Sequence, residues 1–139
     1  METTKQYMAF VAGETHYAIP MEYVGYIVPA SGKFPRCRPL MMPVYVEYIM
    51  RMEQKLVPIV DLVRFKDDTG IKGQEHTYSF ILVLSYHEEL VGVLTDNIFL
   101  ISEKSEIEAR IEPVTQRMSI KADNENFVLL NVPELYAEI

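Results

Sequence analysis

The sequence of 139 residues contains no tryptophan, one cysteine and three histidines. The single cysteine, Cys37, excludes a disulfide within the chain, and the histidines are too dispersed to form a metal-ligand motif. The six glycines form neither a phosphate-binding loop nor a dinucleotide fingerprint. We therefore expect no metal, no cofactor and no catalytic centre of these kinds.

Long apolar runs and positive charge are also scarce. The longest stretches without a charged residue, such as Thr77–Tyr86, span about ten residues, whereas about 20 are needed to cross a membrane. Glu14 and His16 interrupt the apolar segment Tyr7–Ile19, so a signal-peptide core is missing there. The net charge of −7 argues against nucleic acid and anionic membranes as partners, because both require a cationic face. We expect a soluble cytoplasmic protein without direct membrane insertion.

Short apolar segments separated by turn residues dominate the chain and predict a mainly β fold of small antiparallel barrels. Its length suits one domain, residues 1–139. Met21, Val24 and Val28 recur at helical spacing after Pro20, which predicts a short helix over Met21–Val28. A second short helix is expected from Pro133. The expected strands are Tyr7–Ala12, Thr15–Ile19, Tyr45–Met52, Leu56–Val60, Thr77–Tyr86, Glu89–Thr95, Ile98–Ser102, Ser119–Ala122 and Phe127–Val132, and Glu103–Pro113 suits either a helix or a strand.

Within the segment Lys55–Leu62, the expected strand Leu56–Val60 has apolar residues on both faces. Pro58 has no backbone N–H, which predicts a sheet edge or a bulge at this point. Asp61 ends the apolar run and is expected to cap the turn that follows. A similar sequence, Leu130-Asn131-Val132, ends the last hairpin, which predicts an internal repetition.

These segments resemble the CheW-like chemotaxis coupling family. The resemblance covers residues 6 to 137 and implies two five-stranded SH3-like barrels packed together, without a catalytic site. It also implies an adaptor that binds the regulatory domain of a chemotaxis histidine kinase and the cytoplasmic tip of a chemoreceptor. The matching segments are Pro43-Val44-Tyr45-Val46, Leu56-Val57-Pro58-Ile59-Val60-Asp61-Leu62, Leu90-Val91-Gly92-Val93-Leu94-Thr95-Asp96 and Phe127–Leu135.

Residue by residue, the resemblance assigns partner-binding roles. Val24 and Ile27 match family positions that line a groove between the barrels and hold the receptor tip. Phe80 and Ile98 match positions near the same groove or its rim. Read from the residues alone, Val24 and Ile27 are also compatible with an amphipathic helix that packs on the barrel.

The sequence departs from the family pattern around the turn after residue 52. The family has glycine where this chain has Tyr48, and Arg-Gly where it has Glu53-Gln54. Glu53 reverses the charge and lacks the planar contacts of arginine, and Gln54 is expected at positive φ. Tyr48 and Met52 are candidates for an exposed apolar surface.

Two other readings remain open. The chain is alternatively a signalling module of the same fold with a different protein partner. A more remote alternative is an enzyme. Asp68-Thr69-Gly70 matches the triplet of aspartic proteases but lacks flanking apolar strands that would bury it. Cys37 lies between Arg36 and Arg38, which favours thiolate chemistry.

Overall fold

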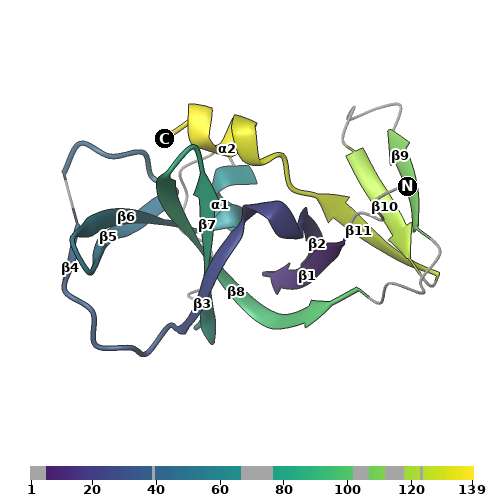
Figure 1. The fold of residues 1–139 in the computed structure, drawn as a ribbon. Helices are drawn as coiled ribbons and strands as arrows, with labels where there is room; N and C mark the ends of the chain where they lie inside the picture. The colour runs from purple at the N-terminus through teal and green to yellow at the C-terminus, as the bar shows by residue number, and fades with distance from the viewer. Residues whose placement is uncertain (1–5, 39, 67–76, 102–106, 112–117, 123) are drawn as a thin grey trace.

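The computed structural model describes residues 6–38, 40–66, 77–101, 107–111, 118–122 and 124–139. Within these residues, short strands dominate, with two short α-helices and one 3-10 turn, so the mainly β class is confirmed (Figure 1). The elements are β1 Tyr7–Ala12, β2 Thr15–Pro20, η1 Met21–Tyr23, β3 Val24–Pro29, β4 Arg36–Cys37, β5 Val46–Met52, β6 Lys55–Val60, α1 Leu62–Lys66, β7 Phe80–Tyr86, β8 Glu89–Leu100, β9 Ile107–Ile111, β10 Met118–Ala122, β11 Glu125–Leu129 and α2 Val132–Ala137.

Strand β8 is 12 residues long and joins the two parts of the sheet, one with β4, β5, β6 and β7 and the other with β1, β2, β9, β10 and β11. Its first half pairs antiparallel with β7 and parallel with β6, and its last residues pair antiparallel with β1. Figure 1 shows β4, β5 and β6 on one side of this strand and β9, β10 and β11 on the other. The prediction of two separate strands, Glu89–Thr95 and Ile98–Ser102, is therefore wrong, because the ladder continues across Asp96 and Asn97 through a bulge.

Three β-bulges change the direction of side chains in β3, β5 and β8. In each, the ladder register shifts by one residue, at Gly25, at Glu47 and near Asn97. Asn97 has a φ of 48°, the left-handed conformation that asparagine tolerates better than most residues. An extra residue moves the following side chain to the other face of the sheet, so the sequence period of two is broken at these points.

The predicted helix over Met21–Val28 is also wrong beyond its first turn. Only Met21–Tyr23 is helical, as a 3-10 turn, and Val24–Pro29 forms β3. The bulge at Gly25 explains the misleading pattern: Val24 lies opposite Leu84 and Ile27 opposite Leu82 on β7, so residues three apart share one face. The spacing that suggested a helix thus arises from a bulged strand. For Glu103–Pro113, the strand reading holds over β9; its remaining residues lie outside the described part.

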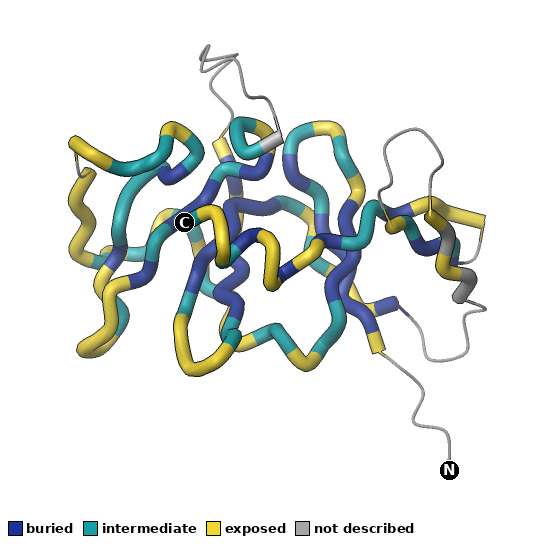
Figure 2. The backbone as a smooth tube through the Cα atoms, turned by 90° about the horizontal axis from the view of Figure 1, so that it is seen from above, coloured by how far each residue is buried: buried dark blue, intermediate teal, exposed yellow. Residues whose placement is uncertain are grey.

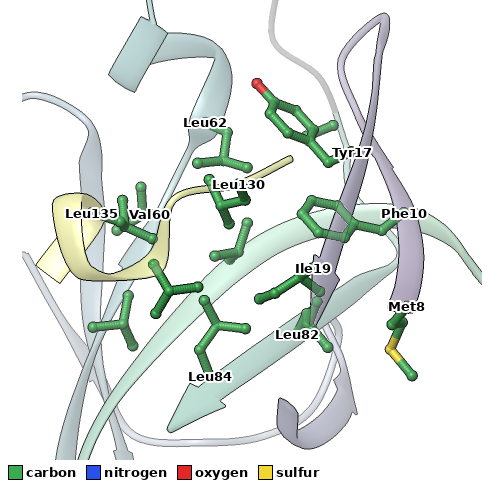
Figure 3. Packing of buried hydrophobic residues seen from close by; sticks show 14 of the residues in the cluster. Met8, Phe10, Tyr17, Ile19, Val60, Leu62, Leu82, Leu84, Leu130 and Leu135 are labelled. Atoms are coloured by element: carbon green, nitrogen blue, oxygen red, sulfur yellow. The ribbon is translucent and has the colours of Figure 1, made fainter. Parts of the chain in front are cut away.

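In the described part of the chain, the core consists of three clusters of buried side chains. The central cluster collects residues from both parts of the sheet and from α2 (Figure 3). A second cluster lies within β5, β6, β7 and β8, and a third lies among β1, β2, β10 and β11. Buried segments accordingly run through the middle of the chain trace, and exposed residues concentrate at the turns (Figure 2). This arrangement is consistent with two packed barrels, which remain a prediction in that detail. The largest side chains of the central cluster include Phe10, Ile19, Leu62, Leu82, Leu84 and Leu135.

The predicted internal repetition is present in the structure. The hairpin β5–β6 leads into α1, and the hairpin β10–β11 leads into α2. Asp61 Oδ1 accepts the N–H of Val63 at 3.0 Å, as expected for a cap, and Asn131 Oδ1 accepts the N–H of Glu134 at 3.1 Å. The second strand of each of these hairpins also pairs with a parallel strand. Strand β6 pairs with β8 of the β7–β8 hairpin, and β11 pairs with β2 of the β1–β2 hairpin. Strand β6 pairs with β8 only from Ile59 onward. Pro58 therefore precedes this ladder, at a point where β6 does not need a backbone N–H to bond to β8.

One buried hydroxyl provides a test of the packing. Thr95 is fully buried, and its Oγ1 has no hydrogen-bond partner among the described residues. Thr95→Val replaces this hydroxyl with a methyl group of the same shape, so it should raise the free energy of unfolding by about 1 kcal/mol. Urea denaturation measures the change. Thr95→Ser, the matched control, keeps the hydroxyl and loses a methyl group, and it should lower stability by a similar amount. Lower stability of Thr95→Val would show that the hydroxyl is satisfied.

Candidate functional site: an apolar face and a charged strand end

Three of the predicted partner-binding residues lie on one face of the β3–β7 ladder. Val24 and Ile27 lie opposite Leu84 and Leu82, and directly opposite residues of an antiparallel pair point to the same side. Phe80 precedes Leu82 by two residues, so it points to that side as well. Val24 packs against the central cluster, whereas Ile27 and Phe80 remain 45% and 38% exposed.

Ile98 also packs against the central cluster, from the far end of β8. Leu100, two residues further, lies opposite Met8, a member of that cluster, and is 61% exposed. The sequence analysis missed Leu100, although the alternation of Ile98 and Leu100 in an uncharged run was the available signal. We refer to Val24, Ile27, Phe80, Ile98 and Leu100 together as the apolar face.

Tyr48 lies elsewhere, on β5, and its side chain points inward. It lies opposite Ile59 and packs with Met52 against the cluster of β5 to β8, so the two are half-buried and not an exposed surface as predicted. The bulge at Glu47 causes this direction by sending Val46 to the central cluster and Tyr48 to the neighbouring one. Burial raises the pKa of the Tyr48 phenol above its usual value, which keeps the ring neutral.

The Arg36 side chain holds the segment between β3 and β4 against Tyr48. The guanidinium of Arg36 lies over the Tyr48 ring, 4.6 Å from its centre, and its Nη2 donates to the carbonyls of Ala30 and Gly32 at 2.6 and 3.1 Å. One face of the ring is therefore covered by a cation that is itself fixed by backbone acceptors. A partner approaching Tyr48 from this side meets the guanidinium first.

Glu47 connects Arg38, which directly follows β4, to α1. Its carboxylate is bonded on both oxygens, to Arg38 Nη2 at 3.1 Å and to Arg64 Nη1 at 2.8 Å. The Arg64 side chain is 20% exposed and that of Glu47 15%, whereas the Arg38 side chain is 66% exposed. The bulged residue thus serves as the ionic link between β4, β5 and α1, and Arg38 still reaches the surface.

Glu53 lies at the first position of the two-residue turn between β5 and β6. Its φ is 55°, and it is the left-handed residue of this turn, whereas the sequence analysis expected Gln54. The first central residue of a two-residue hairpin turn needs positive φ, and the Met52–Lys55 pair puts Glu53 there. Its side chain is exposed. Arg51 Nε donates to the carbonyl of Glu53 at 3.2 Å, so a cation lies against the backbone of the turn.

The six predicted residues therefore fall into two groups. Val24, Ile27, Phe80 and Ile98 belong to the apolar face, while Tyr48 and Glu53 belong to the end of the sheet formed by β4, β5 and β6. None of the six lines the pocket of about 420 Å³ that lies between β6, β8 and α2.

The structure describes one of the two residues considered for enzymatic chemistry. Cys37 is an exposed free thiol on β4, and Asp68 lies outside the described residues. Among the described residues, no three of the side chains of His, Cys, Asp and Glu gather in a way that could hold a metal ion. In that part of the chain no helix is long and apolar enough to span a bilayer.

Comparison with known proteins defines the class. The family model described as the CheW-like domain matches residues 6–139, so the chain belongs to the CheW-like domain family. The scaffolding protein TtCheW from Thermoanaerobacter tengcongensis has a similar structure, with a TM-score of 0.71 and 21% sequence identity. The match covers 94% of this chain and 90% of TtCheW. A search of curated proteins finds no significant match.

The family assignment sets the type of activity. CheW-like proteins are non-enzymatic scaffolds of chemotaxis signalling, so this chain is an adaptor of that kind and not a protease or thiol enzyme. The apolar face and the charged end of β4, β5 and β6 are accordingly candidate protein-binding surfaces.

The turn after β5 yields a stability test. Glu53→Gly should raise the free energy of unfolding by about 1 kcal/mol, because glycine adopts positive φ without the cost of a Cβ atom. Gln54→Gly is the matched control in the same turn and should give no gain. Thermal melting of both variants measures the difference. A gain from Gln54→Gly alone would show that the left-handed residue has been assigned to the wrong position.

Proposed function

We propose that this chain couples a chemoreceptor to a chemotaxis histidine kinase in the cytoplasm. The apolar face binds the cytoplasmic tip of the receptor, and the end formed by β4, β5 and β6 contacts the regulatory domain of the kinase. The observation that carries the proposal is the apolar face, where bulges at Gly25 and near Asn97 bring partly exposed Ile27 and Leu100 above the central cluster, beside Phe80 of β7.

The chemistry of this face suits an α-helical tip. A helix presents apolar side chains in a stripe, and such a stripe is recognised by an apolar surface on a rigid support. The floor of the face is the central cluster, to which both parts of the sheet contribute. A bound helix would therefore contact a surface that does not need to fold or rearrange on binding, which limits the entropic cost of association.

The kinase contact is proposed for a separate set of elements. Strand β4 is at the end of the strand order, and the β5–β6 turn lies beside it. The two groups of residues share no member, so both partners can be held at once. Coupling then follows from geometry, because one body touches receptor and kinase together.

The charge at Glu53 favours a second candidate, a scaffold of the same fold with a different partner. An exposed carboxylate stands where the resemblance places an arginine, and it would repel an acidic kinase surface. Arg51, whose guanidinium lies over the turn, offsets this repulsion in part. Binding measurements separate the two candidates.

The receptor contact can be tested by calorimetric titration with a receptor tip from the same organism. Ile27→Asp should weaken binding by about tenfold or more, since it places a charge in an apolar contact. Ile111→Asp, which changes an apolar residue on β9 that is 66% exposed, should leave receptor binding unchanged. Equal affinity of the native chain and Ile27→Asp, with melting temperatures preserved, would remove the apolar face as the receptor site.

The kinase contact is tested in the same instrument with the regulatory domain of the kinase and Glu53→Arg. If the native chain binds the kinase domain and Glu53→Arg weakens that binding, Glu53 is a specificity residue that matches this kinase. If the native chain does not bind and Glu53→Arg binds, the chain is a scaffold that no longer interacts with this kinase. Absence of binding by both would favour another partner.

A further inference from the structure

Three tyrosine rings form a row that leads from α2 to the start of β3. The ring centre of Tyr136 on α2 lies 5.2 Å from that of Tyr86 on β7, and the Tyr86 ring lies 5.9 Å from that of Tyr23 in η1. The ring planes meet at 61° and 62°, the edge-to-face arrangement that aromatic pairs favour. All three rings are half-buried and pack against the central cluster. We refer to Tyr23, Tyr86 and Tyr136 as the aromatic row.

The row is anchored at α2 by a hydroxyl group. The Tyr136 hydroxyl lies 3.0 Å from the carbonyl oxygen of Leu84 on β7 and 2.9 Å from that of Glu89 on β8. Burial raises the pKa of the Tyr136 phenol, so the hydroxyl keeps the proton that it donates to these carbonyls. Leu84 is also the residue that faces Val24 in the β3–β7 ladder. The anchor of the row and the start of β3 therefore meet at the same residue of β7.

The bulge at Gly25 separates the start of β3 from the rest of its ladder. The β3–β7 ladder opens with the Val24–Leu84 pair, and the next pair after the bulge is Tyr26–Val83. On the other side of Val24 the chain enters η1, where the Tyr23 ring meets the Tyr86 ring. The pair that defines the bulge thus lies between a register shift and a ring contact.

The direction of Ile27 depends on this bulge. A Cβ atom at Gly25 would lie 3.1 Å from the carbonyl oxygen of Val83, so glycine allows the two backbones to approach here. Without the bulge, each later residue of β3 would move back by one partner, and Ile27 would lie opposite Ile81. Ile81 is buried in the cluster of β5 to β8, so Ile27 would leave the apolar face and Tyr26 would take its place.

We propose that the aromatic row fixes the bulged register of β3, and that Tyr86 is a positioning residue for receptor binding. Tyr86 acts through Tyr23, which holds the Val24–Leu84 pair in place and so keeps Ile27 on the apolar face. The inference rests on the proposed function, because it names a residue that keeps the receptor-binding surface in shape. The register itself can be measured without a receptor, which separates the two.

Amide hydrogen exchange of the free protein, followed by NMR, tests the register. Tyr86→Leu keeps an apolar side chain but removes both edge-to-face contacts, so the amides of β3 should exchange about tenfold faster relative to those of β1. Tyr86→Phe keeps the ring and should exchange like the native chain. Phe65→Leu, the matched control, removes the edge-to-face contact between Phe65 and Tyr45 and should leave the ratio of β3 to β1 unchanged.

A second variant approaches the same contact from η1. Tyr23→Leu removes the Tyr23–Tyr86 contact and leaves Tyr86 packed on Tyr136, so it should accelerate the exchange of β3 as Tyr86→Leu does. The double variant should add little to either single change, because both remove one interaction. Unchanged exchange of β3 in Tyr86→Leu and in Tyr23→Leu overturns the proposal, as does an equal acceleration of β3 in Phe65→Leu.

Calorimetric titration measures the consequence for binding. Tyr86→Leu should bind the receptor tip about tenfold more weakly, while Tyr86→Phe and Phe65→Leu should bind it like the native chain. The affinity for the regulatory domain of the kinase should be the same in all of these variants. Undiminished receptor binding by Tyr86→Leu, or an equal loss in Phe65→Leu, overturns the positioning role. A native chain that binds no receptor tip overturns the proposed function and with it this role, whereas the exchange measurements still decide whether the row fixes the register.

Discussion

Strand β8 is the element on which the arrangement of this protein depends. It pairs with β6 and β7 at its start and with β1 at its end, so one continuous backbone holds both parts of the sheet. The bulge near Asn97 lets the strand change partners without breaking. Hydrogen bonds on the two sides of one strand are worth little individually, but together they fix the relative position of everything that packs on them.

The bulges also decide where the candidate binding residues point. In regular strands Val24 and Ile27 would lie on opposite faces, whereas Val46 and Tyr48 would share one face. An extra residue in each strand instead turns Ile27 toward the apolar face and sends Val46 and Tyr48 to different clusters, with Glu47 between them bridging Arg38 and Arg64. The binding surfaces of this scaffold are thus produced by irregularities in a sheet whose regular parts form the core.

Sequence patterns predicted the regular parts of this structure well. The hairpins around Gly13 and His87, the cap at Asp61 and the final helix all follow from local propensity and turn chemistry. The patterns failed at irregular positions. The spacing of Val24 and Ile27 predicted a helix because the bulge in β3 is defined by its pairing with β7, which the sequence of β3 alone does not contain. In the β5–β6 turn, positive φ was predicted for Gln54, whereas the residue with positive φ is Glu53. For the site, the family resemblance supplied residues that periodicity alone did not. Neither the resemblance nor the periodicity assigned Leu100 to the site.

The order of the strands has a consequence for how the protein is made. β2 pairs with β11, so Tyr17 lies beside Val128, which is 111 residues later in the chain. On a ribosome that adds about 5–20 residues per second, the first hairpin waits roughly 5–20 s for that partner. During this interval the open edge of β2 is exposed, and such edges recruit other strands. Nascent chains of this protein are therefore expected to depend on chaperones until the last hairpin emerges, although the finished scaffold is small.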